Sequence, residues 1–447
     1  MIGEQEAKNI CQQLLSRSKG DSMEVILAAQ DQSLTRFANN EIHQTVYERN
    51  LTATVRLAHG KRLGLASTNR SDPAGLDEAV ERARLNAQAS PEDPHFPGLA
   101  DPAAYGSPDS FDTATAEYSP SKRAEAIQTI CRLATESGLN AYGAFSTGSE
   151  ALAVANSQGV FAYHTGSQAS FLTRVMSEDS SGHAEASAWQ VKRLPVGDLG
   201  RQAIDKAMRG RNPRPVEPGE YTVVIDPYVT QDLVENLNFH GMSAQAVLEG
   251  RSWMNERFGQ QAMSPLVSIW DDGLNEEGQP RPFDFEGVPR QRVSVVDKGV
   301  IGEPVHDRTT ARQAGGSSTG HALPPEMRSY GPLALNLFVA SGEHTVDEMI
   351  RSTPRGLYIT RFWYTRLVHP RDCVVTGMTR DGVFMIEKGE LAYPVKNLRF
   401  TQSYVGALAN VEDVGRQRHL LVSDWGGFAV NVPAMKIAAF DFTGSTV

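Results

Sequence analysis

Residues 236–254, NLNFHGMSAQAVLEGRSWM, decide how the second half of the chain is interpreted. Upstream of them, Asp226 can cap a helix and Pro227 fits its first turn. The pattern predicts one helix over 227–249, following a buried strand that begins at Tyr221 and ending at Leu248-Glu249-Gly250. Apolar residues recur at helical spacing and fall close to one stripe of its surface: Val229, Leu233, Leu237, Ala244 and Leu248. Gly241 lies near the same stripe.

The first half of the chain has a different pattern. Residues 22–67 alternate apolar and polar side chains between turn signals, which predicts an antiparallel meander joined at NNE and HGK. Helices are predicted over 72–89, with Asp72 as the N-cap, over 119–138, ending at Gly138, and from about 197 to 209. Five segments of the meander are typical of strands: MEVILAAQ, SLTRFANN, EIHQTVYE, LTATVRLAHG and KRLGLAST.

The segment RGRNPRPVEPGE, at 209–220, interrupts these patterns with three prolines and mixed charge. It divides the chain into an N-terminal domain over 1–210, a linker over 211–220 and a strand-rich domain over 221–447. We therefore expect an α+β fold in which an antiparallel meander-and-helix domain precedes a larger, strand-rich C-terminal domain.

Composition limits the classes of function. A net charge of −10 argues against a general affinity for nucleic acid or an anionic membrane. No apolar run approaches the length of a membrane span, and the N-terminal residues lack the regions of a signal peptide, which indicates a cytosolic protein. The three cysteines, Cys11, Cys131 and Cys373, are far apart, which is typical of reduced thiols rather than a cysteine-rich metal site.

Two stretches carry residues that could do chemistry. Asp271 and Asp272 form a carboxylate pair before Gly273, although Asp-Asp-Gly after a strand is also an ordinary turn. The glycine-rich AGGSSTGHA, 314–322, lacks the lysine and the preceding strand of a phosphate-binding loop, so it is interpreted as a flexible loop. Its glycines would still allow it to lie against an extended peptide.

The histidines give no local metal signature. His306, His321, His344 and His369 lie on different segments, and no helical pair spaced four residues apart is present, so only a long-range cluster remains open. A Ser-His-Asp triad also stays open, although the G-x-S-x-G pattern is absent. The acidic segment SGEHTVDEMI, 341–350, is better explained as the capped start of a helix.

Several longer segments resemble the TldD/PmbA family, whose members are labelled peptidases or modulators of DNA gyrase. In the second half these are FDFEGVPRQRVSVVDKGVIGE (283–303), GLYITRF (356–362), VTGMTRDGVFMIEKGELAYPVKNLRF (375–400) and VPAMKIAAFDFTG (432–444). In the first half, SLTRFANNEIHQ, RLGLASTN and LDEAVERARLNA fit the same family. The resemblance thus covers nearly the whole chain, and the combined order of the segments is specific.

The resemblance implies where a zinc site would lie. The catalytic branch carries His-Glu-x-x-x-His shortly before Gly-Leu-Glu-Gly, and a cysteine near the C-terminus supplies a third ligand. Alignment on Leu248-Glu249-Gly250 places Gly241, Met242 and Ala246 at these three positions. His240 is one residue out of register with this motif. Cys373 lies on a different segment from the family's cysteine, and the C-terminal region around SDWGGFAVNVP contains no cysteine. This pattern matches the PmbA-like (TldE) branch, which lacks the ligands.

From this resemblance we expect a non-catalytic, cytosolic subunit that binds no zinc itself and pairs with a TldD-like zinc-bearing subunit or with itself. His240, Glu249 and Arg251 are candidates for a groove that holds an unfolded peptide. Two alternatives remain open, which are a peptide-binding homodimer without proteolysis and a hydrolase with a site of its own. No direct nucleic-acid or membrane partner is expected.

Overall fold

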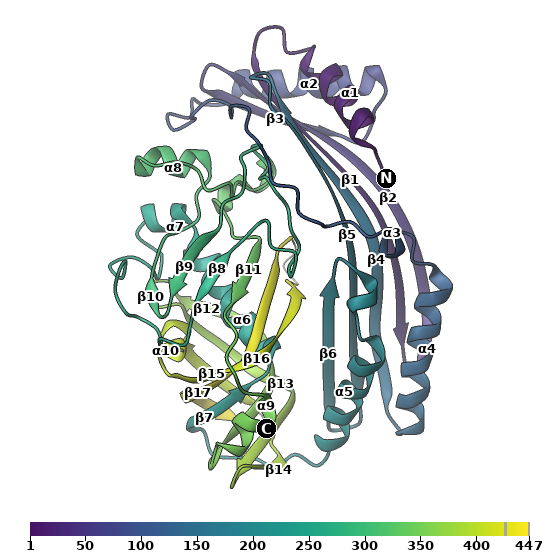
Figure 1. Cartoon of the computed structure of the whole chain (residues 1–447), viewed down its shortest axis with the longest axis vertical. Helices are drawn as coiled ribbons and strands as arrows, with labels where there is room; N and C mark the ends of the chain where they lie inside the picture. The colour runs from purple at the N-terminus through teal and green to yellow at the C-terminus, as the bar shows by residue number, and fades with distance from the viewer. Residues whose placement is uncertain (424–426, 446–447) are drawn as a thin grey trace.

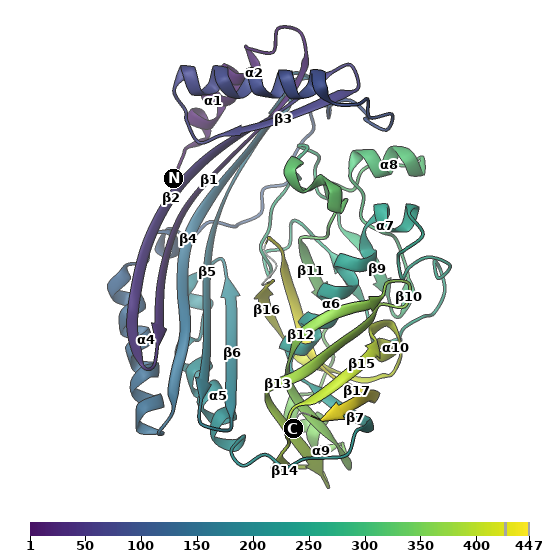
Figure 2. The same cartoon turned by 180° about the vertical axis from the view of Figure 1, so that it is seen from behind.

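The computed structural model describes residues 1–423 and 427–445, and it divides into two β-sheets with their helices (Figures 1 and 2). The fold is α+β, as predicted: an N-terminal six-stranded antiparallel sheet with helices precedes a larger mixed sheet. None of the helices within these residues combines the length and the apolar character that a membrane crossing requires.

The N-terminal sheet has the order β3-β2-β1-β4-β5-β6. Its strands are β1 (Ser22–Ala38), β2 (Glu41–His59), β3 (Arg62–Thr68), β4 (Asn140–Asn156), β5 (Phe161–Met176) and β6 (Ser181–Ala188). Helices α1 (Glu4–Leu15) and α2 (Pro73–Ala89) pack at one end of these long, curved strands (Figure 1). Helices α4 (Pro120–Glu136) and α5 (Val196–Arg209) pack towards the other end. The short helix α3 (Thr113–Ala116) lies between these pairs and contacts a 3-10 turn, Val191–Arg193.

The prediction of five strands over 22–67 was wrong for the first four, because they merge into the two long strands β1 and β2, whereas the fifth, KRLGLAST, corresponds to the short strand β3. The polar residues near Gln30 and Asn50 do not turn, since these two residues pair with each other and Gln30 also pairs with Glu150 of β4. The predicted turns at Asn39-Asn40 and Gly60 are present, with left-handed backbone at all three residues.

The predicted helices of this half are confirmed. The Asp72 side chain accepts a hydrogen bond from the Gly75 N–H and caps α2. Ser119 caps α4 in the same way, and Gly138 follows that helix in the left-handed conformation. The predicted apolar face of α2 is buried against the sheet, and it consists of Leu76, Ala79, Ala83 and Ala87.

The second sheet contains eleven strands in mixed orientation. Strand β7 pairs with both β12 and β17, so β17, β15, β13, β12 and β7 form a closed circuit. The strands are β7 (Gly219–Ile225), β8 (Ile269–Asp271), β9 (Val293–Asp297), β10 (Val300–Ile301), β11 (Asn336–Val339), β12 (Arg355–His369), β13 (Val374–Glu387), β14 (Glu390–Pro394), β15 (Leu398–Ser403), β16 (Val411–Val422) and β17 (Ala429–Ser445). The sequence HLLVSDW, 419–425, is also typical of a strand, and its first four residues lie in β16, while Asp424 and Trp425 lie outside the described residues.

Short helices complete this half. The predicted capped start at 341–350 is confirmed, because Thr345 caps α9 and its partner Glu348 closes a capping box. The helices are α6 (Pro227–Leu237), α7 (Ala244–Leu248), α8 (Arg308–Ala314), α9 (Val346–Arg351) and α10 (Tyr404–Ala409), with a 3-10 turn at Pro325–Tyr330.

The single helix predicted over 227–249 is broken into two. After α6, Asn238–Met242 widens into a π-helical turn, and Ser243 is extended before α7 begins. The break arises because the backbone there pairs with Val305, which accepts from the Ala244 N–H and donates to the Met242 carbonyl. Leu248 lies beyond the break and is 45% exposed, whereas Leu237 is fully buried.

The residue before α6 was also interpreted wrongly. Asp226 occupies the N-cap position, but its side chain makes no capping hydrogen bond. One carboxylate oxygen instead pairs with Lys206 of α5 at 2.7 Å, and the other accepts from the Tyr358 hydroxyl at 3.0 Å. Asp226 therefore connects the two halves of the chain rather than capping its helix.

Candidate functional site beside helix α6

The three positions that match the family's zinc motif are part of the packed core. Gly241 lies against Trp253, and a Cβ atom at position 241 would overlap the indole ring. Met242 and Ala246 are fully buried. The indole is fixed because its N–H donates to the Leu237 carbonyl at 2.8 Å. None of the three therefore carries an imidazole or a carboxylate that could bind zinc or activate water, and position 241 has no room for a larger side chain in the present packing.

The surrounding residues do not fit a zinc ion either. His240 lies in the π-helical turn, and burial, together with the charge of Arg251, lowers its pKa. Cys373 is fully buried among apolar side chains, and burial raises the pKa of its thiol, which disfavours the thiolate that zinc requires. Over residues 1–423 and 427–445, no three His, Cys, Asp or Glu side chains gather so that they could hold a metal ion.

The predicted groove residues lie on the same segment. Glu249 is exposed and forms an ion pair with Arg251 at 2.5 Å, and it also accepts a hydrogen bond from Gln245. His240, Glu249 and Arg251 are not among the residues that line the cavity beside α6. Their role in peptide binding stays a prediction.

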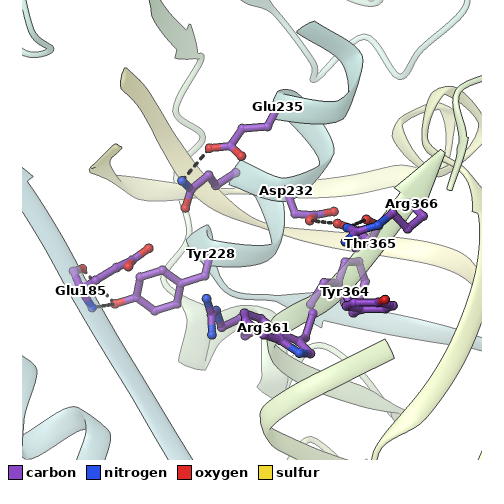
Figure 3. Close-up of a pocket in the computed structure, with 11 residues that line it drawn as sticks. Glu185, Tyr228, Asp232, Glu235, Arg361, Tyr364, Thr365 and Arg366 are labelled. Atoms are coloured by element: carbon purple, nitrogen blue, oxygen red, sulfur yellow. Dashed lines mark hydrogen bonds between the residues drawn. The ribbon is translucent and has the colours of Figure 1, made fainter. Parts of the chain in front are cut away.

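The face of α6 that points away from the core borders a cavity of about 420 Å³ (Figure 3). Four of its residues line the cavity at the spacing of one helical face: Tyr228, Gln231, Asp232 and Glu235. Val229, Leu233 and Leu237 on the same helix belong to the core of the C-terminal half. Glu185 of β6 closes the other side, so both halves of the chain contribute to the lining.

Strand β12 supplies the remaining wall. All six residues from Arg361 to Arg366 line the cavity. Side chains alternate between the faces of a strand, so a consecutive run indicates that the strand presents its edge to the cavity. In the described part of the chain, β12 pairs with β7 only over Leu357–Ile359, and from Arg361 onwards its only partner strand is β13. The cavity thus lies along an open sheet edge.

Hydrogen bonds fix the polar side chains of the lining. Asp232 accepts from the Tyr404 hydroxyl at 2.5 Å and from the Thr365 hydroxyl at 2.8 Å, and burial raises its pKa to about 6. Gln231 donates to Glu235 at 2.7 Å (Figure 3). The Asp232–Thr365 bond joins α6 to β12, the Tyr404–Asp232 bond joins α6 to α10, and the Gln231–Glu235 bond lies within α6.

The lining is fixed to the N-terminal sheet as well. The Tyr228 hydroxyl accepts from the Glu185 backbone N–H at 3.0 Å and donates to the Glu185 carbonyl at 3.1 Å. Arg361 pairs with the buried Asp381 at 3.2 Å, and Asp381 also pairs with Arg174 of β5. The cavity therefore has preformed walls, as ligand sites usually do.

Two other predicted residues do come together, but in a buried network. His321 contacts Asp271 at 2.9 Å through one ring nitrogen and the Thr319 hydroxyl at 2.9 Å through the other. Asp271 also pairs with Arg290. Both His321 and Asp271 are fully buried, so a substrate cannot reach the imidazole, and we assign the network a structural role.

The remaining candidates are dispersed. Asp272 is not part of this network, because its side chain accepts a hydrogen bond from the Leu274 N–H. This is the ordinary turn that Asp-Asp-Gly after a strand also predicted. His344 and His369 lie in separate exposed ion pairs with Asp413 and Asp372. Of the other three candidate histidines, His306 is the one close to His321. The Thr319 hydroxyl, which contacts His321, accepts from the His306 backbone N–H and donates to the His306 carbonyl.

Sequence reasoning missed every residue of the cavity. The spacing of Tyr228, Gln231, Asp232 and Glu235 was a usable signal, because these polar or amphipathic residues share one face of a helix whose other face is apolar. The open edge of β12 had no such signal, since it depends on how far β7 extends beside it.

The sequence matches known families over most of its length. A model of the PmbA/TldA metallopeptidase C-terminal domain matches residues 218–444, and a model of PmbA/TldA metallopeptidase domain 1 matches residues 23–87. The metalloprotease PmbA of Escherichia coli O157:H7 is 23% identical over 443 residues, which cover 95% of this chain and 94% of that protein. A metalloprotease of Methanothermobacter thermautotrophicus is 25% identical over 243 residues, and the match spans about half of that relative's length (53%).

Solved structures share the fold. TldE from Thermococcus kodakarensis superposes with a TM-score of 0.87 at 18% identity, over 98% of this chain and all (100%) of that one. A putative modulator of a DNA gyrase from Thermotoga maritima superposes with a TM-score of 0.86 at 19% identity, over 98% of this chain and 100% of that one. Because the first family model alone matches just over half of the sequence, this chain belongs to the PmbA/TldD metallopeptidase family.

Proposed function

We propose that this chain is a peptide-binding subunit that does not cleave its substrate alone, and that a TldD-like subunit supplies zinc and activates water. The proposal rests on a contrast between two regions next to α6, which are the positions aligned with the zinc motif and the cavity. Gly241 packs against Trp253, and Met242 and Ala246 are buried, while a cavity along the edge of β12 lies next to α6.

An extended peptide is the ligand that this arrangement supports. In the described residues no second strand pairs with β12 beyond Ile359, and a peptide strand added at such an edge binds through backbone hydrogen bonds rather than through particular side chains. An unfolded segment entering the cavity would lie along the edge of β12 near Trp363 and Tyr364, beside the polar face of α6. Binding through the backbone suits a protein that handles many unfolded sequences.

We also propose that the chain acts in the cytosol and as a dimer, either with itself or with the TldD-like subunit. A subunit without ligands has a physical reason to persist if it shapes the groove of its partner. A stable dimer would bury at least about 1,200–2,000 Å². Light scattering should therefore give twice the monomer mass at micromolar concentration, and a monomer would contradict this part of the proposal.

The decisive experiment combines zinc analysis with peptide cleavage. Purified alone and treated with a mild chelator, the chain should hold far less than one zinc ion per subunit and should bind an unfolded peptide without cutting it. Addition of a TldD-like subunit should restore cleavage. Stoichiometric, chelator-resistant zinc with cleavage by this chain alone would instead support a hydrolase with its own site. Binding that no partner converts into cleavage would support the homodimeric peptide binder.

A further inference from the structure

Strand β12 contains an irregularity where it borders the cavity. Trp363 pairs with Met378 and Arg366 pairs with Thr376, so Tyr364 and Thr365 together lie opposite Gly377 alone. This two-against-one arrangement is a β-bulge. Tyr364 has a φ of 57°, in the left-handed region that bulges of this kind usually assign to glycine. A bulky aromatic residue there is a strained choice.

The neighbouring residues hold the bulge in place. A Cβ atom at Gly377 would lie 2.8 Å from the Thr365 methyl carbon, so the glycine makes room for the threonine. The Thr365 hydroxyl donates to Asp232 of α6. Thr365 is thereby drawn inwards, and the ring of Tyr364 remains 67% exposed. Backbone strain of this kind clusters at ligand clamps and active sites.

The residue before the bulge presents a second ring. Trp363 is 36% exposed, and three guanidinium groups lie over its indole at 4.7–5.7 Å from the ring centroid: Arg174, Arg361 and Arg380. Arg174 and Arg361 are themselves fixed by Asp381. Trp363 and Tyr364 both line the cavity, and the guanidinium group of Arg366 lies over the Tyr364 ring at 4.5 Å from its centroid (Figure 3 labels Tyr364).

We propose that Trp363 and Tyr364 form an aromatic platform that binds a large apolar or aromatic side chain of the bound peptide. This inference rests on the proposed function and adds a side-chain preference to a site that otherwise binds backbone. Rigid, partly exposed tryptophan and tyrosine next to arginine are the residues that most often dominate binding interfaces.

The charges of the lining favour an uncharged side chain. Neither a positive nor a negative ligand has a clear advantage, because the lining contains groups of both charges. The carboxylates are Glu185, Asp232 and Glu235, and the guanidinium groups are Arg361 and Arg366. Asp232 already accepts two hydrogen bonds from hydroxyl groups. A bulky apolar group would instead pack against the exposed parts of Trp363 and Tyr364 and remove them from water.

The test separates a binding role for Tyr364 from a structural one. A structural role predicts a lower Tm in Tyr364→Gly, whereas a binding role predicts weaker peptide binding without a loss of Tm. In Tyr364→Gly the strained position receives the residue that it favours and loses its ring. We expect an unchanged or higher Tm together with about tenfold weaker binding of a labelled, unstructured peptide that contains one phenylalanine. Lys388→Gly is the matched control, since Lys388 is exposed, has a φ of 54° and lies outside the lining of the cavity. It should leave peptide affinity unchanged.

A peptide series completes the experiment. Three peptides differ only at the central residue, which is phenylalanine, alanine or lysine, and fluorescence anisotropy measures their affinities. The wild-type chain should prefer phenylalanine over both others, and Tyr364→Gly should abolish that preference. Equal affinities for the three peptides, or an unchanged preference in Tyr364→Gly, would overturn the platform while leaving backbone binding intact. If none of the peptides binds the wild-type chain, the proposed function fails, and the platform fails with it.

Discussion

Helix α6 and the segment that follows it, 238–248, show how one stretch of chain can serve two purposes. One face of α6 is packed in the core and the other borders a cavity. In the following segment, Gly241, Met242 and Ala246 are all buried, and the ring of Trp253 fills the space beside Gly241. The difference teaches that one face of a helix can pack into the core while the other borders a cavity, with the positions aligned to the family's zinc motif buried just beyond it.

The largest expected effect tests the packing of 238–248. Trp253→Ala removes a fully buried indole and its hydrogen bond to the Leu237 carbonyl, so it should lower the free energy of unfolding by about 3–5 kcal/mol. Trp363→Ala is the comparison, because Trp363 is partly exposed. Denaturant unfolding of both variants measures the contrast, and similar losses would mean that Trp253 is not the centre of this packing.

The next contrast compares leucines before and after the break in the helix. Leu237→Ala should cost about 2–5 kcal/mol, because the side chain is fully buried in the core. Leu248→Ala should change stability by less than about 1 kcal/mol, because Leu248 lies on the exposed surface of α7. Equal costs for the two variants would show that the chain forms the continuous helix that the sequence pattern predicts.

Gly241 offers a smaller test of the same region. Gly241→Ala places a methyl group where the Trp253 indole lies, and it should cost about 1–3 kcal/mol as overpacking. Gly316→Ala is the control, since nothing lies within 4 Å of its added Cβ atom. A neutral Gly241→Ala variant would show that the region has room to regain a side chain.

On the α6 side, the smallest effect is a pH dependence. Burial raises the pKa of Asp232 to about 6, so the folded state binds more protons than the unfolded state between about pH 4 and pH 6. The contribution of Asp232 to stability should therefore fall as pH rises through this window. Relative to Asp232→Asn, the wild-type Tm should decrease from about pH 4 to 6, and parallel pH profiles would contradict the burial of this carboxylate.

The order of elements and their caps could be predicted from local patterns. Asp72 with Pro73 and Ser119 with Pro120 marked helix starts, and the Asn39-Asn40 turn marked the end of a strand. Long strands were divided in error because polar residues near Gln30 suggested a turn. Their pairing with strands on both sides keeps them extended, and this pairing is not visible in a local window.

The site was less predictable because it depends on contacts between distant segments. The helix break at Ser243 follows from pairing with Val305, more than sixty residues away. The cavity requires that β7 stops beside Ile359 and that β6 approaches α6. The bulge at Tyr364 lacked its usual glycine signal. The assignment of Gly241, Met242 and Ala246 to the family's zinc motif came from the family resemblance alone, and the expectation that this chain binds no zinc stays a prediction.

Hydrogen–deuterium exchange with a saturating unfolded peptide tests the central claim most directly, because it reports on both regions at once. Backbone amides over 361–366 on the edge of β12 should become protected when the peptide binds, while amides over 238–251 should exchange at the same rate with and without it. Protection at His240, Glu249 and Arg251 without protection along β12 would contradict the account. It would place the peptide on the segment that this structure assigns to packing.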